Sequence, residues 1–197
     1  TSSGKTLLAE FNIIITKALD MDSKIVYVVP SRALVNQVYS DLRTDFGGLD
    51  FQVEKTSGAI EIDPSEDMML HEKIDILVST PEKLDLLIRR DHPSVKDVSL
   101  FVVDEAHMIR NGERGARLEL LLSILKRERP NSRFMFLSPF LNDSADLIAE
   151  WMGGSRNRTS VKINWKPSEK ILIGISVAGK KKLFNQFSYT LLPSAYS

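Results

Sequence analysis

The stretch Leu100–Ile109 reads LFVVDEAHMI, and its first half is typical of a buried strand. Four apolar residues in a row indicate a strand that is covered on both faces of its sheet. Asp104 and Glu105 follow directly. Ligands of open α/β sheets bind at the carboxyl ends of strands, and paired acids there are costly unless they face a cation or take part in acid–base chemistry. We therefore predict that both acids belong to a binding site, with a solvated turn after an edge strand as the alternative.

Helical and strand patterns alternate on both sides of this stretch. Repetition of strand, helix and strand predicts an α/β fold in which a parallel sheet carries helices on both faces. The expected helices cover 5–21, 31–46, 81–90, 115–130 and 142–154, and the expected strands cover 24–29, 51–56, 75–79, 98–107 and 133–138. In the first helix the apolar residues recur at helical spacing. They are Leu7, Leu8, Phe11, Ile14, Ile15, Ala18 and Leu19.

The alternating pattern stops near Ser155. We predict that residues 1–154 form one domain that is incomplete at its start. Residues 155–197 are expected to form an edge strand, at 171–177, and a linker toward a second domain.

Composition excludes some classes of function. The 197 residues include 26 basic and 26 acidic side chains, so no overall positive field indicates a nucleic-acid partner, although a local groove can still be basic. Cysteine is absent, which excludes a disulfide scaffold and thiolate metal sites and fits an intracellular location, either cytoplasmic or in the nucleus or nucleoid. No apolar run approaches the ~20 residues that span a bilayer, so no membrane partner is expected.

The first six residues, TSSGKT, resemble the end of a phosphate-binding loop. The full pattern is G-x-x-x-x-G-K-[ST], and its first glycine would precede Thr1. At a helix start, Gly4 allows close approach of a phosphate, Lys5 can reach the β and γ oxygens, and the Thr6 hydroxyl can bind magnesium. Either the match is ordinary helix N-terminal chemistry, or the chain begins inside its own nucleotide site. Asp104 in turn suits magnesium held through water, and Glu105 suits orienting or deprotonating an attacking water.

SGKT and DEAH together resemble motifs I and II of the superfamily 2 helicases. The intervening segments occur in the order of that family: VVPSRALVNQ resembles motif Ia, VSTPEKLDLLIR resembles motif Ib, and FLSPFLNDSADLIAEWMG occupies the place of motif III. The extended DEAHMIRNGERGARLE is similar to the superkiller-like branch, which includes RNA-exosome helicases, spliceosomal unwinding enzymes and archaeal repair helicases. The resemblance covers residues 1 to about 153, and several motifs agree in order and spacing.

The resemblance implies the first of two RecA-like domains in an ATP-dependent motor that acts on DNA or RNA, held by its backbone as a single strand. Its partner would be the second RecA-like domain. The residues implied for ATP and Mg²⁺ are Ser3, Gly4, Lys5, Thr6, Asp104 and Glu105, with Thr6 and Asp104 holding the metal and with Lys5, Asp104 and Glu105 in catalysis. The residues implied for the nucleic-acid backbone are Pro30, Ser31, Arg32, Thr80, Pro81 and Lys83, and those implied for coupling are His107 and Ser138.

Motif III departs from the family, which usually has Ser-Ala-Thr where this chain has Ser138-Pro139-Phe140. Proline cannot donate an N–H and the third hydroxyl is gone, so coupling of hydrolysis to strand movement is in doubt. Arg110, Arg114 and Arg117 are expected to lead away from the strand end, so the arginine finger should come from the second domain. Two alternatives stay open: a degenerate helicase domain that acts as a scaffold, and a non-motor P-loop enzyme such as a kinase.

Overall fold

The computed structural model describes residues 4–57, 70, 73–110, 112–138, 144–153, 172–177 and 187–192. These residues fall into two compact units, one that contains the described part of residues 4–153 and one that contains residues 172–177 and 187–192. Each unit is described by itself.

The first unit is built on a five-stranded parallel sheet with the strand order β2-β3-β1-β4-β5. The three inner strands, β3, β1 and β4, are almost entirely buried, which explains their largely apolar sequences. All the carboxyl ends lie at one edge because the strands are parallel. The strands are β1 (Lys24–Val28), β2 (Val53–Thr56), β3 (Ile76–Ser79), β4 (Val98–Val103) and β5 (Arg133–Phe136).

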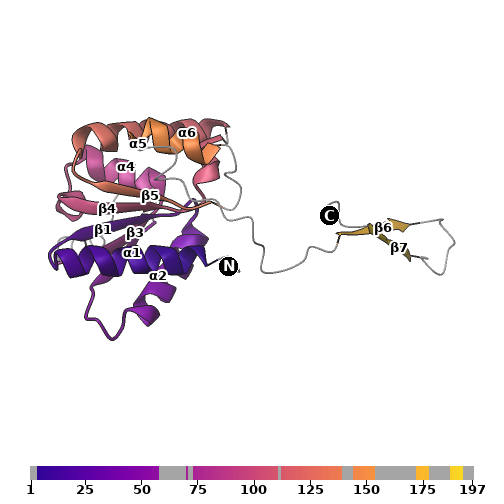
Figure 1. Cartoon of the computed structure of the whole chain (residues 1–197), viewed down its shortest axis with the longest axis horizontal. Coiled ribbons are helices and arrows are strands. Elements are labelled where there is room, and N and C mark those ends of the chain that lie inside the picture. The colour runs from indigo at the N-terminus through magenta and orange to yellow at the C-terminus, as the bar shows by residue number, and fades with distance from the viewer. Residues whose placement is uncertain are drawn as a thin grey trace. The chain divides into compact units, whose positions relative to one another are not determined.

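Helices cover both faces of this sheet, as predicted. Figure 1 shows α1 and α2 on one face and α4, α5 and α6 on the other. The helices are α1 (Lys5–Leu19), α2 (Arg32–Asp45), α4 (Pro81–Arg89), α5 (Gly112–Glu128) and α6 (Ser144–Trp151), and the short 3₁₀ helices are η1 (Pro93–Val95) and η2 (Ala106–Arg110).

The core divides into two layers because successive side chains of a strand point to opposite faces. In β1, Ile25 and Tyr27 pack with α1 and α2, whereas Val26 and Val28 pack with α4 and α5. A third cluster near the carboxyl end of β4 joins Val103 to η2, α5 and Trp151 of α6. The segment that follows β4 is therefore anchored to the core.

The residues that helix α1 buries are not the apolar residues whose helical spacing predicted the helix. Ala9, Ile13, Thr16 and Lys17 face the sheet, while the outward face exposes Leu7, Leu8, Phe11, Ile14, Ile15 and Leu19. Periodicity identified the helix but not its buried face, because this helix is apolar nearly all round. None of the described helices is long and apolar enough to cross a membrane.

The second unit is an antiparallel pair of strands, β6 (Leu172–Val177) and β7 (Phe187–Leu192). The strand expected at 171–177 is thus present, but it pairs with β7 in a sheet of its own rather than at the edge of the parallel sheet. We did not predict β7, because its sequence, FSYTLL, lies in a stretch without a clear period.

Candidate nucleotide site at the carboxyl edge of the sheet

The N-terminus of α1 has the features of an anion-binding site. Gly4 is the N-cap with φ 68°, a left-handed conformation that favours glycine, and the space where a Cβ would lie is open. No side chain caps the helix at this position, and its first turn carries no acid. Among the described residues no side chain therefore caps the first N–H groups of α1, which carry the positive end of the helix dipole. Ser3 lies outside the described residues.

The acids predicted to follow β4 lie at the carboxyl edge, in a tight turn. Asp104 N donates to the Val28 carbonyl at 2.9 Å, so the turn begins beside the end of β1. The next residue, Glu105, has φ 53°, a region that is uncommon outside glycine. Three hydrogen bonds of the described residues hold this turn: Glu105 N donates to Asp104 Oδ1 at 2.8 Å, Ala106 N donates to the Leu137 carbonyl at 2.9 Å, and Met108 N donates to the Glu105 carbonyl at 2.9 Å.

Side chains from three separate segments meet around Glu105 and His107. Lys5 Nζ lies 3.8 Å from Glu105 Oε1, and His107 Nδ1 lies 3.1 Å from Glu105 Oε2. The same His107 nitrogen lies 3.3 Å from the Ser138 hydroxyl, which follows β5. The side chains of Lys5 and Glu105 are 17% and 27% exposed, so both are partly desolvated yet reachable from solvent. The fold thus brings together four of the residues singled out in the sequence. Pro139 and Phe140 lie outside the described residues.

Tyr27 is a further member of the site that sequence reasoning missed. Its hydroxyl donates to Asp104 Oδ2 at 3.5 Å, and the ring is buried in the core beneath the sheet edge. Burial and then the Asp104 carboxylate raise the pKa of Tyr27 far above its usual value, so the hydroxyl stays protonated and serves as a donor. Its strand is a continuous apolar run, so the sequence gave no sign that this tyrosine would lie under the acid.

The oxygen donors at this edge fit a magnesium ion that takes most of its ligands from phosphate and water. Asp104 is partly exposed at the strand end, and Thr6 lies in the first turn of α1. Among the described residues no group of three or more His, Cys, Asp or Glu converges. Magnesium in nucleotide sites commonly uses one or two carboxylates together with substrate phosphates, so a single Asp with a hydroxyl is a suitable set.

The residues expected to bind a nucleic-acid backbone lie at two helix starts on the same edge. Ser31 caps α2 by accepting from Leu34 N at 3.3 Å, and Thr80 caps α4 by accepting from Lys83 N at 3.4 Å. Arg32 is exposed, whereas Lys83 is only 2% exposed. Burial makes Lys83 unsuited to a direct phosphate contact. Of these two cations, Arg32 is therefore accessible to a phosphate and Lys83 is not.

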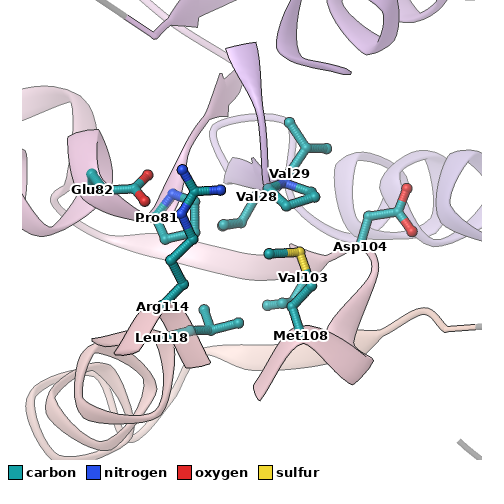
Figure 2. A pocket seen from close by; sticks show the side chains of 10 residues that line it. Val28, Val29, Pro81, Glu82, Val103, Asp104, Met108, Arg114 and Leu118 are labelled. Atoms are coloured by element: carbon teal, nitrogen blue, oxygen red, sulfur yellow. The ribbon is translucent and has the colours of Figure 1, made fainter. Parts of the chain in front are cut away.

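A small pocket separates the predicted nucleotide residues from the start of α4 (Figure 2). Arg114, which we expected to lead away from the strand end, is one of its walls. That expectation was wrong because η2 and the first turn of α5 return the chain to the sheet edge. In Figure 2 the Arg114 guanidinium lies near Pro81, and Asp104 lies on the other side of the pocket. The lining consists of Val28, Val29, Pro30, Pro81, Glu82, Val103, Asp104, Met108, Arg114 and Leu118.

Comparison with known families agrees with this geometry. The model of the family described as DEAD/DEAH box helicase matches residues 1–147. The chain belongs to the DEAD/DEAH box helicase family. The resemblance to the superfamily 2 helicases is therefore confirmed at the level of the family. Members of this family use ATP and bind nucleic acid.

Curated relatives of this helicase domain include the U5 small nuclear ribonucleoprotein 200 kDa helicase and the ATP-dependent DNA helicase Hel308. The U5 small nuclear ribonucleoprotein 200 kDa helicase of Homo sapiens is 37% identical over 166 residues, which is 81% of this chain and 8% of the relative. The ATP-dependent DNA helicase Hel308 of Thermococcus kodakarensis is 34% identical over 169 residues, covering 86% of this chain and 14% of the relative. Hel308 of Methanocella arvoryzae is 33% identical over 187 residues, or 92% of this chain and 24% of the relative. The chain thus spans less than a quarter of each of these relatives.

Solved structures confirm the RecA-like fold. The DUF1998 helicase MrfA bound to DNA and AMPPNP aligns with a TM-score of 0.65 at 24% identity, over 79% of this chain and 23% of that one. A second crystal structure of the DUF1998 helicase MrfA aligns with a TM-score of 0.67 at 21% identity, over 78% of this chain and 25% of that one. The likeness extends to the parallel sheet with helices on both faces.

Proposed function

We propose that this helicase-family chain is the ATP-binding and nucleic-acid-binding motor domain of an ATP-dependent DNA or RNA helicase or translocase. The observation that carries the proposal is the line of contacts from Lys5 through Glu105 and His107 to Ser138. It joins the start of α1, the turn after β4 and the end of β5 at one edge of the sheet. A contact chain of this kind lets a change at a bound phosphate alter the segment after β5.

Each polar group at the edge has a separate role in the proposed reaction. The N–H groups at the start of α1 and the Lys5 ammonium bind the β and γ phosphates. Thr6 and Asp104 would hold Mg²⁺, which when bound neutralises charge on the phosphate oxygens. The Glu105 carboxylate orients the attacking water and accepts its proton. Its contact with His107 fixes the direction of that carboxylate.

The starts of α2 and α4 supply the proposed grip on the polynucleotide backbone. Hydroxyls and N–H groups at helix starts bind phosphates without reading bases. Arg32 adds an exposed cation, and Lys83 is left out because it is buried. The DNA helicase Hel308 and the U5 ribonucleoprotein helicase are both among the relatives, so either DNA or RNA is a suitable substrate. The residues proposed for these contacts are Pro30, Ser31, Arg32, Thr80 and Pro81.

A second RecA-like domain is part of the proposal, as the partner that supplies an arginine to the γ-phosphate. Such an arginine finger contributes roughly 10³–10⁵ in rate in P-loop enzymes. We also retain the division of the chain into a RecA-like domain at 1–154 and a connecting segment at 155–197. An intracellular location, which fits the absence of cysteine, completes the proposal.

Nucleotide titration of the full-length protein and its Lys5→Ala variant tests the proposed site. We expect the variant to bind fluorescent ATP at least about tenfold more weakly, because charge-assisted contacts to a phosphate are lost. Lys73→Ala is the matched control: Lys73 is 71% exposed and precedes β3, at the opposite edge of the sheet. Equal ATP affinity in the wild type and the Lys5→Ala variant would contradict the assignment and favour a scaffold.

A further inference from the structure

Arg114 occupies a position that the proposed function does not yet use. It lines the pocket whose other walls come from the end of β1, the start of α4 and the end of β4. Figure 2 shows its side chain extending from α5 across the pocket, with the guanidinium beside Pro81. Pro30, from the segment before α2, lines the same pocket. The arginine therefore lies between the two segments that we propose to hold the polynucleotide.

The backbone around Arg114 fixes this placement. Gly112 begins α5 with φ +50°, and Gly115 packs directly against η2. A Cβ at Gly115 would lie only 2.2 Å from the Ile109 carbonyl oxygen, so the first turn of α5 is pressed onto the segment that follows β4. Arg114 adjoins this contact. The Cα of Arg114 is thereby held close to the sheet edge.

The guanidinium of Arg114 has no partner among the residues that the structure describes. Arg117, one turn along the same helix, pairs with Glu113 at 2.5 Å, and Arg127 pairs with Glu128 at 3.3 Å. Arg114 is exposed, and although Glu82 lines the same pocket, the two form no ion pair. A planar fork of five N–H donors is thus presented to solvent beside two helix starts.

We propose that Arg114 binds a backbone phosphate of the polynucleotide where the strand crosses the carboxyl ends of β1 and β3. This inference rests on the proposed function. Guanidinium suits bidentate phosphate recognition, and such contacts fix the register of a strand without reading its sequence. Glu82 faces the same space and opposes an anion there, so its charge weakens the contact that Arg114 makes. Through Gly115 and η2, this phosphate contact adjoins the segment that carries His107.

Anisotropy titrations of the full-length protein with labelled oligothymidylate and oligouridylate, repeated over a range of salt concentrations, test the inference. Arg114→Ala should weaken binding about tenfold and make the slope of log K against log salt shallower by about 0.7, the value of one phosphate on a single strand. Arg114→Lys should keep the slope but bind more weakly than wild type, because a point charge lacks the fork. Glu82→Gln should bind more tightly.

Arg117→Ala is the matched control, since this arginine is exposed on the same helix but already paired. It should leave both affinity and slope unchanged, and ATP affinity should be unchanged in all variants. Equal affinity and slope for wild type and Arg114→Ala would overturn the inference and leave the proposed function intact. Loss of ATP affinity with unchanged polynucleotide binding would also overturn it. A wild-type protein that binds neither oligonucleotide would contradict the proposed function and the inference together.

Discussion

Glu105 is held in a conformation that the chain does not adopt without cost. A left-handed backbone costs an L residue about 1–2 kcal/mol, and here it is maintained by the hydrogen bonds of the turn that follows β4. Strain of this kind is concentrated at functional sites, where it places a side chain in a required direction. The result is a carboxylate whose two oxygens face Lys5 and His107. The turn therefore orients the acid before any ligand binds.

Replacing Glu105 by glutamine separates binding from chemistry. We expect Glu105→Gln to keep ATP affinity, because the proposed magnesium and phosphate ligands remain, while turnover falls by about two orders of magnitude or more. Steady-state hydrolysis and ATP titration on the same preparation provide the two readouts. Glu113→Gln, at an exposed ion pair on α5, should match wild type in both. Unchanged turnover in Glu105→Gln would remove this residue from the mechanism.

At the scale of elements, the joint between η2 and α5 links the nucleotide edge to the pocket that Arg114 lines. Gly115 makes the joint possible, because its missing side chain leaves room for the carbonyl groups of Met108 and Ile109. The nearest atoms belong to the backbone, which cannot move aside as a flexible side chain can. The Glu-Arg-Gly sequence after motif II therefore has a packing role at glycine and, in our inference, a phosphate-binding role at arginine.

Substitution of Gly115 by alanine should disturb this joint. We expect Gly115→Ala to lower the free energy of unfolding by about 1–3 kcal/mol, as other overpacked sites do, and to lower ATP turnover because η2 carries His107. Thermal or denaturant unfolding, followed by an ATPase assay, gives both values. Gly48→Ala, where the added methyl meets open space, is the control and should be close to neutral. Wild-type stability in Gly115→Ala would show that the close contact is absent in solution.

Helix α1 has two faces with different roles. Its inner face ends in a buried ion pair, in which Lys17 Nζ lies 2.5 Å from Asp75 Oδ1 and also donates to the Met21 carbonyl at 2.7 Å. Asp75 accepts in turn from Gln52 N at 2.8 Å, so the pair ties α1 to β3 and β2 at the edge opposite the nucleotide site. Such pairs are costly to break because one charge stays buried. The pair thus fixes the orientation of the helix whose start binds phosphate.

At the scale of the whole molecule, sequence patterns predicted the architecture well for physical reasons. Buried parallel strands require continuous apolar runs, and Leu100–Val103 is such a run. Parallel strands also place their carboxyl ends at one edge, and Glu105 and Ser138 each follow such a strand. Lys5 follows the glycine of a phosphate-binding loop. The proximity of these three residues could therefore be anticipated from the sequence.

Features that depend on three-dimensional packing could not be read from the sequence. Arg114 is one of several arginines after β4, and only the contact of η2 with Gly115 shows that it returns to the sheet edge. Tyr27 sits in an apolar strand like its neighbours, and only the register of β1 against β4 places its hydroxyl under Asp104. The burial of Lys83 likewise follows from how α4 packs, whereas the resemblance to the helicases implied that Lys83 contacts the nucleic-acid backbone.

The central claim is that nucleotide hydrolysis and polynucleotide binding are coupled in this helicase domain. The most direct measurement is steady-state ATP hydrolysis by the full-length protein, with and without saturating single-stranded DNA or RNA, beside the Lys5→Ala variant. We expect one or both polynucleotides to stimulate hydrolysis by the wild type, and the variant to stay at background with either. Hydrolysis that proceeds at the same rate with and without both polynucleotides would contradict the claim.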